Sequence, residues 1–191
     1  MYLFFDTETT GLPKRWDAPA SDLDNWPRLV QIAWVYYNGN GKEIFSKSVI
    51  IKPEGFDIPA DSAKIHGITT EIAKKEGKTL NKILSEFLDA MNKSKFLIAH
   101  NMSFDEKIIE AEFLRKEIPT SLFQPEKICT KEISTEFCKI PGNYGYKWPT
   151  LSELHIKLFG DDFDEAHDAL VDVSACARCF FELKKLGVVN V

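Results

Sequence analysis

The sequence has 191 residues, an apolar fraction of 44% and a charged fraction of 28%, values typical of one globular domain over residues 1–191 rather than a disordered, fibrous or membrane protein. Its formal net charge of −5 argues against a protein that coats duplex nucleic acid through a broad basic surface. An enzyme that holds cations with clustered carboxylates stays compatible with this charge, because the cations offset it locally.

Apolar periodicity predicts strands and helices in an alternating order. In chain order we expect strands at 1–5, 29–37 and 43–51, a helix at 80–91, a strand at 96–100, a helix at 103–116, a strand at 127–129, and helices at 151–159 and 169–186. The turn at 38–41, Asn-Gly-Asn-Gly, makes the second and third strands a hairpin. The order predicts an α/β fold with a mixed five-stranded sheet, antiparallel at the hairpin and parallel at the crossovers, with helices on both faces.

Two segments do not fit regular structure, and we predict irregular loops at 13–27 and 139–149. The first is polar and carries Trp16 and Trp26. Long loops in a compact domain are usually functional or mobile. The second loop lies between Gly and Pro residues and carries Tyr144, Tyr146, Lys147 and Trp148.

The cysteines favour a reducing cytoplasm. They are too few and too irregularly spaced for a disulfide scaffold, and the N-terminus does not resemble a secretory signal. Cys176 and Cys179 form a C-x-x-C pair within a helical pattern, but without a second pair they fit buried small residues better than a zinc or redox site. No apolar run reaches membrane-spanning length, so we expect no membrane partner.

Two carboxylates stand where the first strand ends. Asp6 and Glu8 are two positions apart, so both side chains leave the same face while Thr7 points the other way. Like charges this close repel each other unless a cation lies between them. A solvated strand end is the alternative interpretation for this pair taken alone.

Further acids follow the fourth strand and open the last helix. Asp105 falls in the first turn of a helix near the sheet edge where Asp6 lies, although the helix dipole alone also favours an acid there. Asp168 is the expected N-cap of the last helix. Asp172 would face inward one turn later, where it needs a compensating partner such as a metal ion. His167 has an ordinary pKa suited to proton transfer near neutral pH.

Four carboxylates and one histidine suit phosphodiester hydrolysis assisted by two metal ions. Hard oxygen ligands select Mg²⁺ or Mn²⁺, and two such ions stabilise both the attacking and the leaving oxygen. The histidine would take a proton from the attacking water. The sequence has no Ser or Cys nucleophile motif and no phosphate-cradling glycine loop, so this mechanism fits its residues best.

Three segments carry these residues: Asp-Thr-Glu-Thr-Thr-Gly-Leu from Asp6, His-Asn-x-x-Phe-Asp from His100, and Ala-His-Asp-Ala-x-x-Asp from Ala166. Together they resemble, in order, the motifs of the DEDDh family of 3′→5′ exonucleases, which are related to the proofreading epsilon subunit of bacterial DNA polymerase III. Residues 65–69 add a further family-like element, and the resemblance covers about residues 1–187. It implies an RNase H-like fold and the release of nucleoside 5′-monophosphates from 3′ ends of nucleic acid, preferably single-stranded DNA.

By matching position, the resemblance implies a role for each residue of the candidate catalytic set. Asp6 would bridge two divalent cations. Glu8 and Asp172 would help hold the ion that carries the attacking water, and Asp105 would support the second ion. His167 matches the general base.

The same resemblance implies residues that contact substrate. Thr9 and Leu12 match positions that contact the terminal nucleotide, with Leu12 as an apolar wedge under the last base. His66 and Phe104 fall where the family lines the nucleotide pocket, although His66 could equally be a structural turn residue.

The sequence departs from this family at two places. The loop at 13–27 looks longer than the usual link, and its Trp16 and Trp26 either stack bases or pack the loop. The chain stops soon after the last helix, so we expect no tail that docks onto a polymerase, and this argues against DNA polymerase association. An RNA 3′-end exonuclease and a polymerase-associated docking subunit are the alternatives, because no motif specifies contacts to the 2′-OH.

Overall fold

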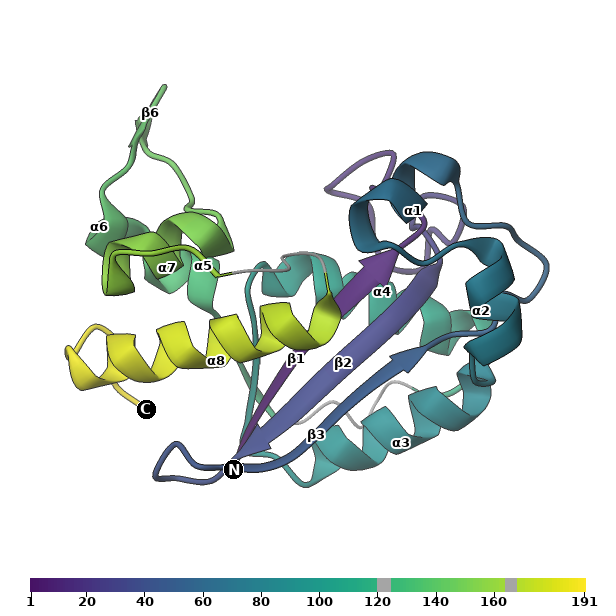
Figure 1. The fold of residues 1–191 in the computed structure, drawn as a ribbon, viewed down its shortest axis with the longest axis horizontal. Coiled ribbons are helices and arrows are strands. Elements are labelled where there is room, and N and C mark those ends of the chain that lie inside the picture. Colours follow the sequence, from purple (N-terminus) through teal and green to yellow (C-terminus); the bar gives the residue numbers. More distant parts are fainter. Residues whose placement is uncertain (120–124, 164–167) are drawn as a thin grey trace.

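A five-stranded sheet forms the centre of the computed structural model, which describes residues 1–119, 125–163 and 168–191 (Figure 1). The strand order is β3-β2-β1-β4-β5, with antiparallel pairing among β1, β2 and β3 and parallel pairing of β4 with both β1 and β5. This arrangement confirms the predicted mixed sheet. The strands are β1 (Tyr2–Thr9), β2 (Leu29–Tyr37), β3 (Glu43–Ile50), β4 (Phe96–Ala99) and β5 (Glu126–Cys129).

The central strand β1 is longer than its apolar run. We predicted that this strand ends at residue 5, but the ladder with β2 continues through Asp6, Thr7 and Glu8. The prediction was wrong because backbone pairing does not stop where the side chains become polar. As a result, two acidic side chains project from a strand that is still paired with β2, rather than from a free loop.

Helices cover both faces of the sheet, as predicted. The helices α3 (Leu80–Asn92) and α4 (Met102–Arg115) pack on one face, and α7 (Leu151–Phe159) and α8 (Ala169–Lys185) pack on the other. Side chains of β1 alternate between these layers, with Phe5 in the core under α3 and α4 and Phe4 in the core under α8. The even-numbered face of β1, which carries both acids, therefore looks toward α8.

Several short elements were not predicted. They are α1 (Ala60–His66), α2 (Thr70–Glu76), α5 (Thr130–Ile133), α6 (Thr135–Cys138), β6 (Pro141–Gly142) and β7 (Gly145–Tyr146). Such pieces are too short to show a clear period. The strands β6 and β7 form a hairpin within 139–149, so the prediction of an irregular loop was wrong there; Gly145, at φ +120°, permits the tight return. Residues 13–27 form no helix or strand, as predicted.

The cysteines behave as small buried residues. Cys176 and Cys179 are buried in α8 with free thiols, which agrees with the prediction. Burial raises the pKa of the Cys179 thiol to about 12, and it raises the pKa of Cys176 as well. Within the described ranges, no helix combines the length and the hydropathy that a membrane crossing requires.

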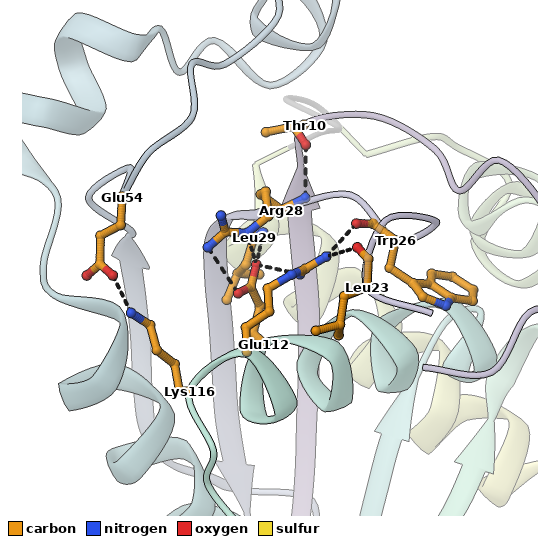
Figure 2. A network of polar contacts seen from close by, with 9 residues as sticks. Thr10, Leu23, Trp26, Arg28, Leu29, Glu54, Glu112 and Lys116 are labelled. Atoms are coloured by element: carbon orange, nitrogen blue, oxygen red, sulfur yellow. Dashed lines mark hydrogen bonds and ion pairs between the residues drawn. The ribbon is translucent and has the colours of Figure 1, made fainter. Parts of the chain in front are cut away.

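A buried carboxylate fastens the start of β2 to α4 (Figure 2). Glu112 is fully buried and accepts hydrogen bonds from Arg28 Nε at 2.8 Å and from the backbone N–H of Leu29 at 3.0 Å. Arg115 Nη1 lies 3.0 Å from the same carboxylate, and its Nη2 donates to the carbonyls of Leu23 and Trp26 at 2.6 and 2.7 Å. The network therefore fixes the end of the 13–27 loop.

We expect Glu112→Ala to lower the free energy of unfolding by about 3–5 kcal/mol, because it leaves two arginines near a buried site without their counter-charge. Urea denaturation followed by circular dichroism measures this loss. Asp61→Ala is the control, since it removes only the exposed ion pair with Lys64 and should leave stability nearly unchanged. Equal midpoints for the Glu112 variant and the parent would contradict the structural role of the network.

Candidate active site

The end of β1 and the first turns of α8 bring three carboxylates together. Asp6 and Glu8 leave β1 on the face that looks toward α8, and Asp172 reaches them from that helix. One carboxylate oxygen from each lies within 4.8 Å of the others. Asp168 caps α8 by accepting hydrogen bonds from two backbone N–H groups, as predicted. This cap fixes where α8 begins, and hence where Asp172 lies.

Asp105 joins the cluster from the opposite layer. It lies in the first turn of α4, is 2% exposed, and accepts hydrogen bonds from Thr7 N at 3.1 Å and Thr7 Oγ1 at 2.7 Å. Parallel pairing of β1 with β4 places the start of α4 at the edge where Asp6 lies. Thr7 was not among the predicted site residues. Because it lies between Asp6 and Glu8 in β1, its side chain projects from the opposite face of the strand, where Asp105 lies.

Burial, together with repulsion between neighbouring charges, raises the pKa values of these carboxyl groups. Burial raises the pKa of Glu8 to about 8, with further contributions from the charges of Asp172 and Asp105. Burial likewise raises the pKa of Asp105 to about 7, although the hydrogen bonds from Thr7 oppose this rise. Asp6 has a pKa well above its usual range, first because of burial and then because of its acidic neighbours.

This donor set fits divalent cations. Within the described part of the chain, no Lys, Arg or His side chain forms an ion pair with Asp6, Glu8 or Asp105. Clustered carboxylate oxygens without a basic partner are the ligands that Mg²⁺ and Mn²⁺ prefer. The closely spaced oxygens of Asp6, Glu8 and Asp172 would hold one ion directly.

We expect the metal-free protein to lose stability as pH rises from about 4.5 to about 8. The folded-state pKa of Glu8 lies above its ordinary value, so in this pH window the folded state binds more protons than the unfolded state. The free energy of unfolding therefore decreases as the pH rises and these protons dissociate. Added Mn²⁺ should reverse the loss. A cation at about a hundred times its Kd adds about 2.7 kcal/mol, or roughly 5–10 °C in Tm for a domain of this size.

Differential scanning fluorimetry with and without a chelator, at pH 5 and pH 8, measures this effect. The Mn²⁺-dependent rise in Tm should be larger at pH 8, where more of the carboxyl groups are ionised than at pH 5 and fewer protons must be displaced by the cation. A rise of equal size at both pH values would mean that the cation binds elsewhere.

His167, the predicted general base, lies outside the described residues, as does Ala166 of the same motif. Asp168, the next residue in sequence, is the N-cap of α8.

A cavity of about 340 Å³ adjoins the carboxylates. It is lined by Asp6, His100, Thr150, Leu151, Ser152, Phe163 and Asp172. His100 Nε2 donates to the carbonyl of Pro149 at 3.1 Å, and its Nδ1 lies 2.9 Å from Thr130 Oγ1. Burial lowers the pKa of His100 to about 4, so this ring is neutral at physiological pH and ties the end of β4 to the segment before α7.

The predicted substrate contacts differ in exposure. Leu12 is 72% exposed, and Phe104 packs its ring against Trp16, with 5.7 Å between the ring centroids. Thr9 is buried, and its hydroxyl donates to the carbonyl of Gly11 at 2.7 Å. His66 Nδ1 accepts a hydrogen bond from the backbone of Ile68 at 3.1 Å, which is the structural turn contact considered as its alternative role.

The two tryptophans of the 13–27 loop have different environments. Trp26 is 3% exposed, and its indole N–H donates to the carbonyl of Pro19 at 2.9 Å, so it packs the loop. Trp16 is 54% exposed, and its own backbone carbonyl accepts a hydrogen bond from Lys107 Nζ at 3.3 Å. Of the two indoles, Trp16 is therefore the one that a base could reach.

Comparisons with known proteins were made at the level of sequence and of fold. The exonuclease family model RNase_T matches residues 3–180. DNA polymerase III PolC-type from Streptococcus thermophilus is 34% identical over 181 residues, which is 94% of this chain and 11% of that protein. The PolC-type polymerase of Staphylococcus aureus is 26% identical over 197 residues, which is 99% of this chain and 12% of that protein. The chain thus spans about a ninth of these relatives.

Solved structures of exonuclease I share the fold. The E. coli enzyme in complex with a dA16 oligonucleotide matches with a TM-score of 0.76 and 19% identity, over 96% of this chain and 40% of that one. Exonuclease I from Methylocaldum szegediense matches with a TM-score of 0.72 and 16% identity, again over 96% and 40%. These likenesses confirm the RNase H-like fold. The family match, which runs through nearly all of the sequence, shows that this chain belongs to the RNase_T exonuclease family.

Proposed function

We propose that the chain is a 3′→5′ exonuclease that hydrolyses terminal phosphodiester bonds of single-stranded DNA and releases nucleoside 5′-monophosphates. The observation that carries the proposal is the convergence of Asp6, Glu8 and Asp172 within 4.8 Å beside a cavity. Membership of an exonuclease family supports it, as does the oligonucleotide in the exonuclease I complex.

In this proposal Asp6, Glu8, Asp105 and Asp172 hold two divalent cations, Mg²⁺ or Mn²⁺. When bound, the cations supply positive charge that stabilises the developing charge on the attacking and leaving oxygens. Thr7 keeps the Asp105 carboxylate in place through two hydrogen bonds. His167 takes the proton from the attacking water, which increases the nucleophilicity of the water oxygen at neutral pH.

The terminal nucleotides would lie against the exposed apolar side chains near the end of β1. We assign Leu12 as the wedge under the last base, with Phe104 beside it, because Leu12 is largely exposed and Phe104 is only partly covered. Trp16, which packs on Phe104, would extend this apolar surface. The hydrogen bond from Thr9 to Gly11 shapes the turn that precedes Leu12. His66, the remaining predicted substrate contact, lies at the end of α1.

A second candidate function is a proofreading module that works with a DNA polymerase. The observation that favours it is the similarity to PolC-type DNA polymerase III over nearly the whole chain. In that case the isolated chain would degrade mismatched 3′ ends slowly and co-purify with a polymerase. The 3′ ends of RNA are the alternative substrate for the isolated enzyme. The cysteine pattern favours the cytoplasm as the compartment in which it acts.

Digestion of end-labelled oligonucleotides tests these proposals. Single-stranded and duplex DNA and RNA, labelled at either end, are incubated with the protein and Mn²⁺. We expect 5′-labelled single-stranded DNA to shorten stepwise, and 3′-labelled DNA to release labelled mononucleotide from the start. Hydrolysis that persists in excess chelator, or cuts inside the strand, would contradict a metal-dependent 3′→5′ exonuclease. Preference for RNA would revise the substrate alone.

A further inference from the structure

The hairpin formed by β6 and β7 exposes three aromatic side chains within five residues. Tyr144 at the turn is 104% exposed, Tyr146 is 46% exposed and Trp148 is 60% exposed. The hairpin projects from the body of the protein beyond α6 and α7 (Figure 1). Single exposed apolar residues are common, but neighbouring exposed aromatic rings indicate an interaction surface.

The hairpin leads directly into the catalytic cavity. Trp148 is followed by Pro149, whose carbonyl accepts the hydrogen bond from His100, and the next three residues line the cavity. Lys147 connects the hairpin to α7, because its Nζ donates to Glu153 Oε1 at 2.6 Å.

Positive charge accompanies these rings. Lys131 Nζ lies 4.8 Å from the centre of the Trp148 ring and donates to Asn101 Oδ1 at 3.1 Å. Lys139 is exposed where the hairpin begins, at the C-cap of α6. Glu153 neutralises Lys147, but Lys131 provides a cation beside the Trp148 ring, and Lys139 adds an exposed positive charge at the start of the hairpin, in a chain whose net charge is −5. Aromatic rings combined with nearby cations are what single-stranded nucleic acid binds: the bases stack and the phosphates pair with the cations.

We propose that Tyr144, Tyr146 and Trp148 form a stacking platform for bases upstream of the scissile phosphate, with Lys131 and Lys139 near the strand backbone. The inference rests on the proposed function and adds a second contact region outside the catalytic cavity. Stacking tolerates every base, so such a platform would hold a strand of any sequence while its 3′ end occupies the cavity.

The kinetic test compares a long strand with a substrate that has no strand. The parent and the Tyr146→Ala/Trp148→Ala double variant are assayed with dT12 and with the p-nitrophenyl ester of thymidine 5′-monophosphate. We expect kcat/KM for dT12 to fall at least tenfold relative to kcat/KM for the ester, because removing each aromatic ring removes the stacking energy of the base that lies on it. Phe45→Ala is the matched control: Phe45 is also 46% exposed but lies on β3, at the opposite edge of the sheet from β5, and should leave the ratio unchanged.

A binding assay in excess chelator separates the platform from catalysis. Fluorescence anisotropy should show that the double variant binds dT12 at least tenfold more weakly than the parent, with no difference for dT2. Unchanged affinity for dT12 would overturn the platform and leave this surface to a protein partner. An equal loss of turnover with both substrates would also overturn it, since the rings would then only support the cavity. If the parent hydrolyses neither substrate, the proposed function fails, and the binding result alone decides the platform.

Discussion

Asp6→Asn is expected to lower kcat/KM about a thousandfold while leaving the fold intact. The charge of Asp6 interacts with the charges of Glu8, Asp105 and Asp172, so its removal affects the whole cluster. The amide keeps the shape of the side chain but removes the charge that attracts the cations. A loss of about 4 kcal/mol of charge stabilisation in the transition state corresponds to this factor. Single-turnover digestion of labelled DNA with Mn²⁺ measures it.

The same substitution should have the opposite effect on stability. Without metal at pH 8, the ionised form of Asp6 is repelled by its acidic neighbours, so the neutral amide should leave Tm unchanged or raise it. The Mn²⁺-dependent rise in Tm should shrink at the same time. If the variant lost activity only because it failed to fold, its Tm in chelator would fall, and the assignment of Asp6 as a metal ligand would lose its support.

His167→Ala is expected to slow turnover by about a hundredfold to ten-thousandfold, the range that a general base contributes. In the parent, the rate should rise with pH as the imidazole loses its proton, because only the neutral ring accepts a proton from water. The variant should lack this dependence, because the imidazole that accepts the proton is absent. Initial rates between pH 5.5 and 9 with saturating Mn²⁺ measure both effects.

Metal binding provides the control for this variant. The Mn²⁺-dependent rise in Tm should equal that of the parent, because the imidazole is not among the expected ligands. A variant with the parent's rate over the whole pH range would remove His167 from the mechanism. One that no longer responds to Mn²⁺ would make it a ligand instead.

Elements with strong local signals were predicted accurately from the sequence. The bounds of α7 agree with the prediction because Thr150 and Glu153 form a capping box at its start and Gly160 ends it at φ +86°. The bounds of β2 also agree, since eight of its nine residues are apolar or aromatic, Gln31 being the exception. The acids Asp6, Glu8 and Asp172 were placed together correctly.

Features that depend on contacts between distant segments were not predictable in this way. The bond from Thr7 to Asp105 joins residues that are neighbours only after β1 and β4 pair, and no local pattern reports it. The ion pairs of Glu112 with Arg28 and Arg115 likewise depend on the packing of α4 over β2. The hairpin at 141–146 has strands of two residues, too few for side-chain alternation to be visible.

The order in which the acids occur along the chain has a consequence during synthesis. During synthesis Asp6 and Glu8 of β1 leave the ribosome before Asp172, which belongs to α8, the last helix of the described structure. The nascent polypeptide therefore cannot assemble its cation-binding centre until α8 has emerged and docked against Phe4.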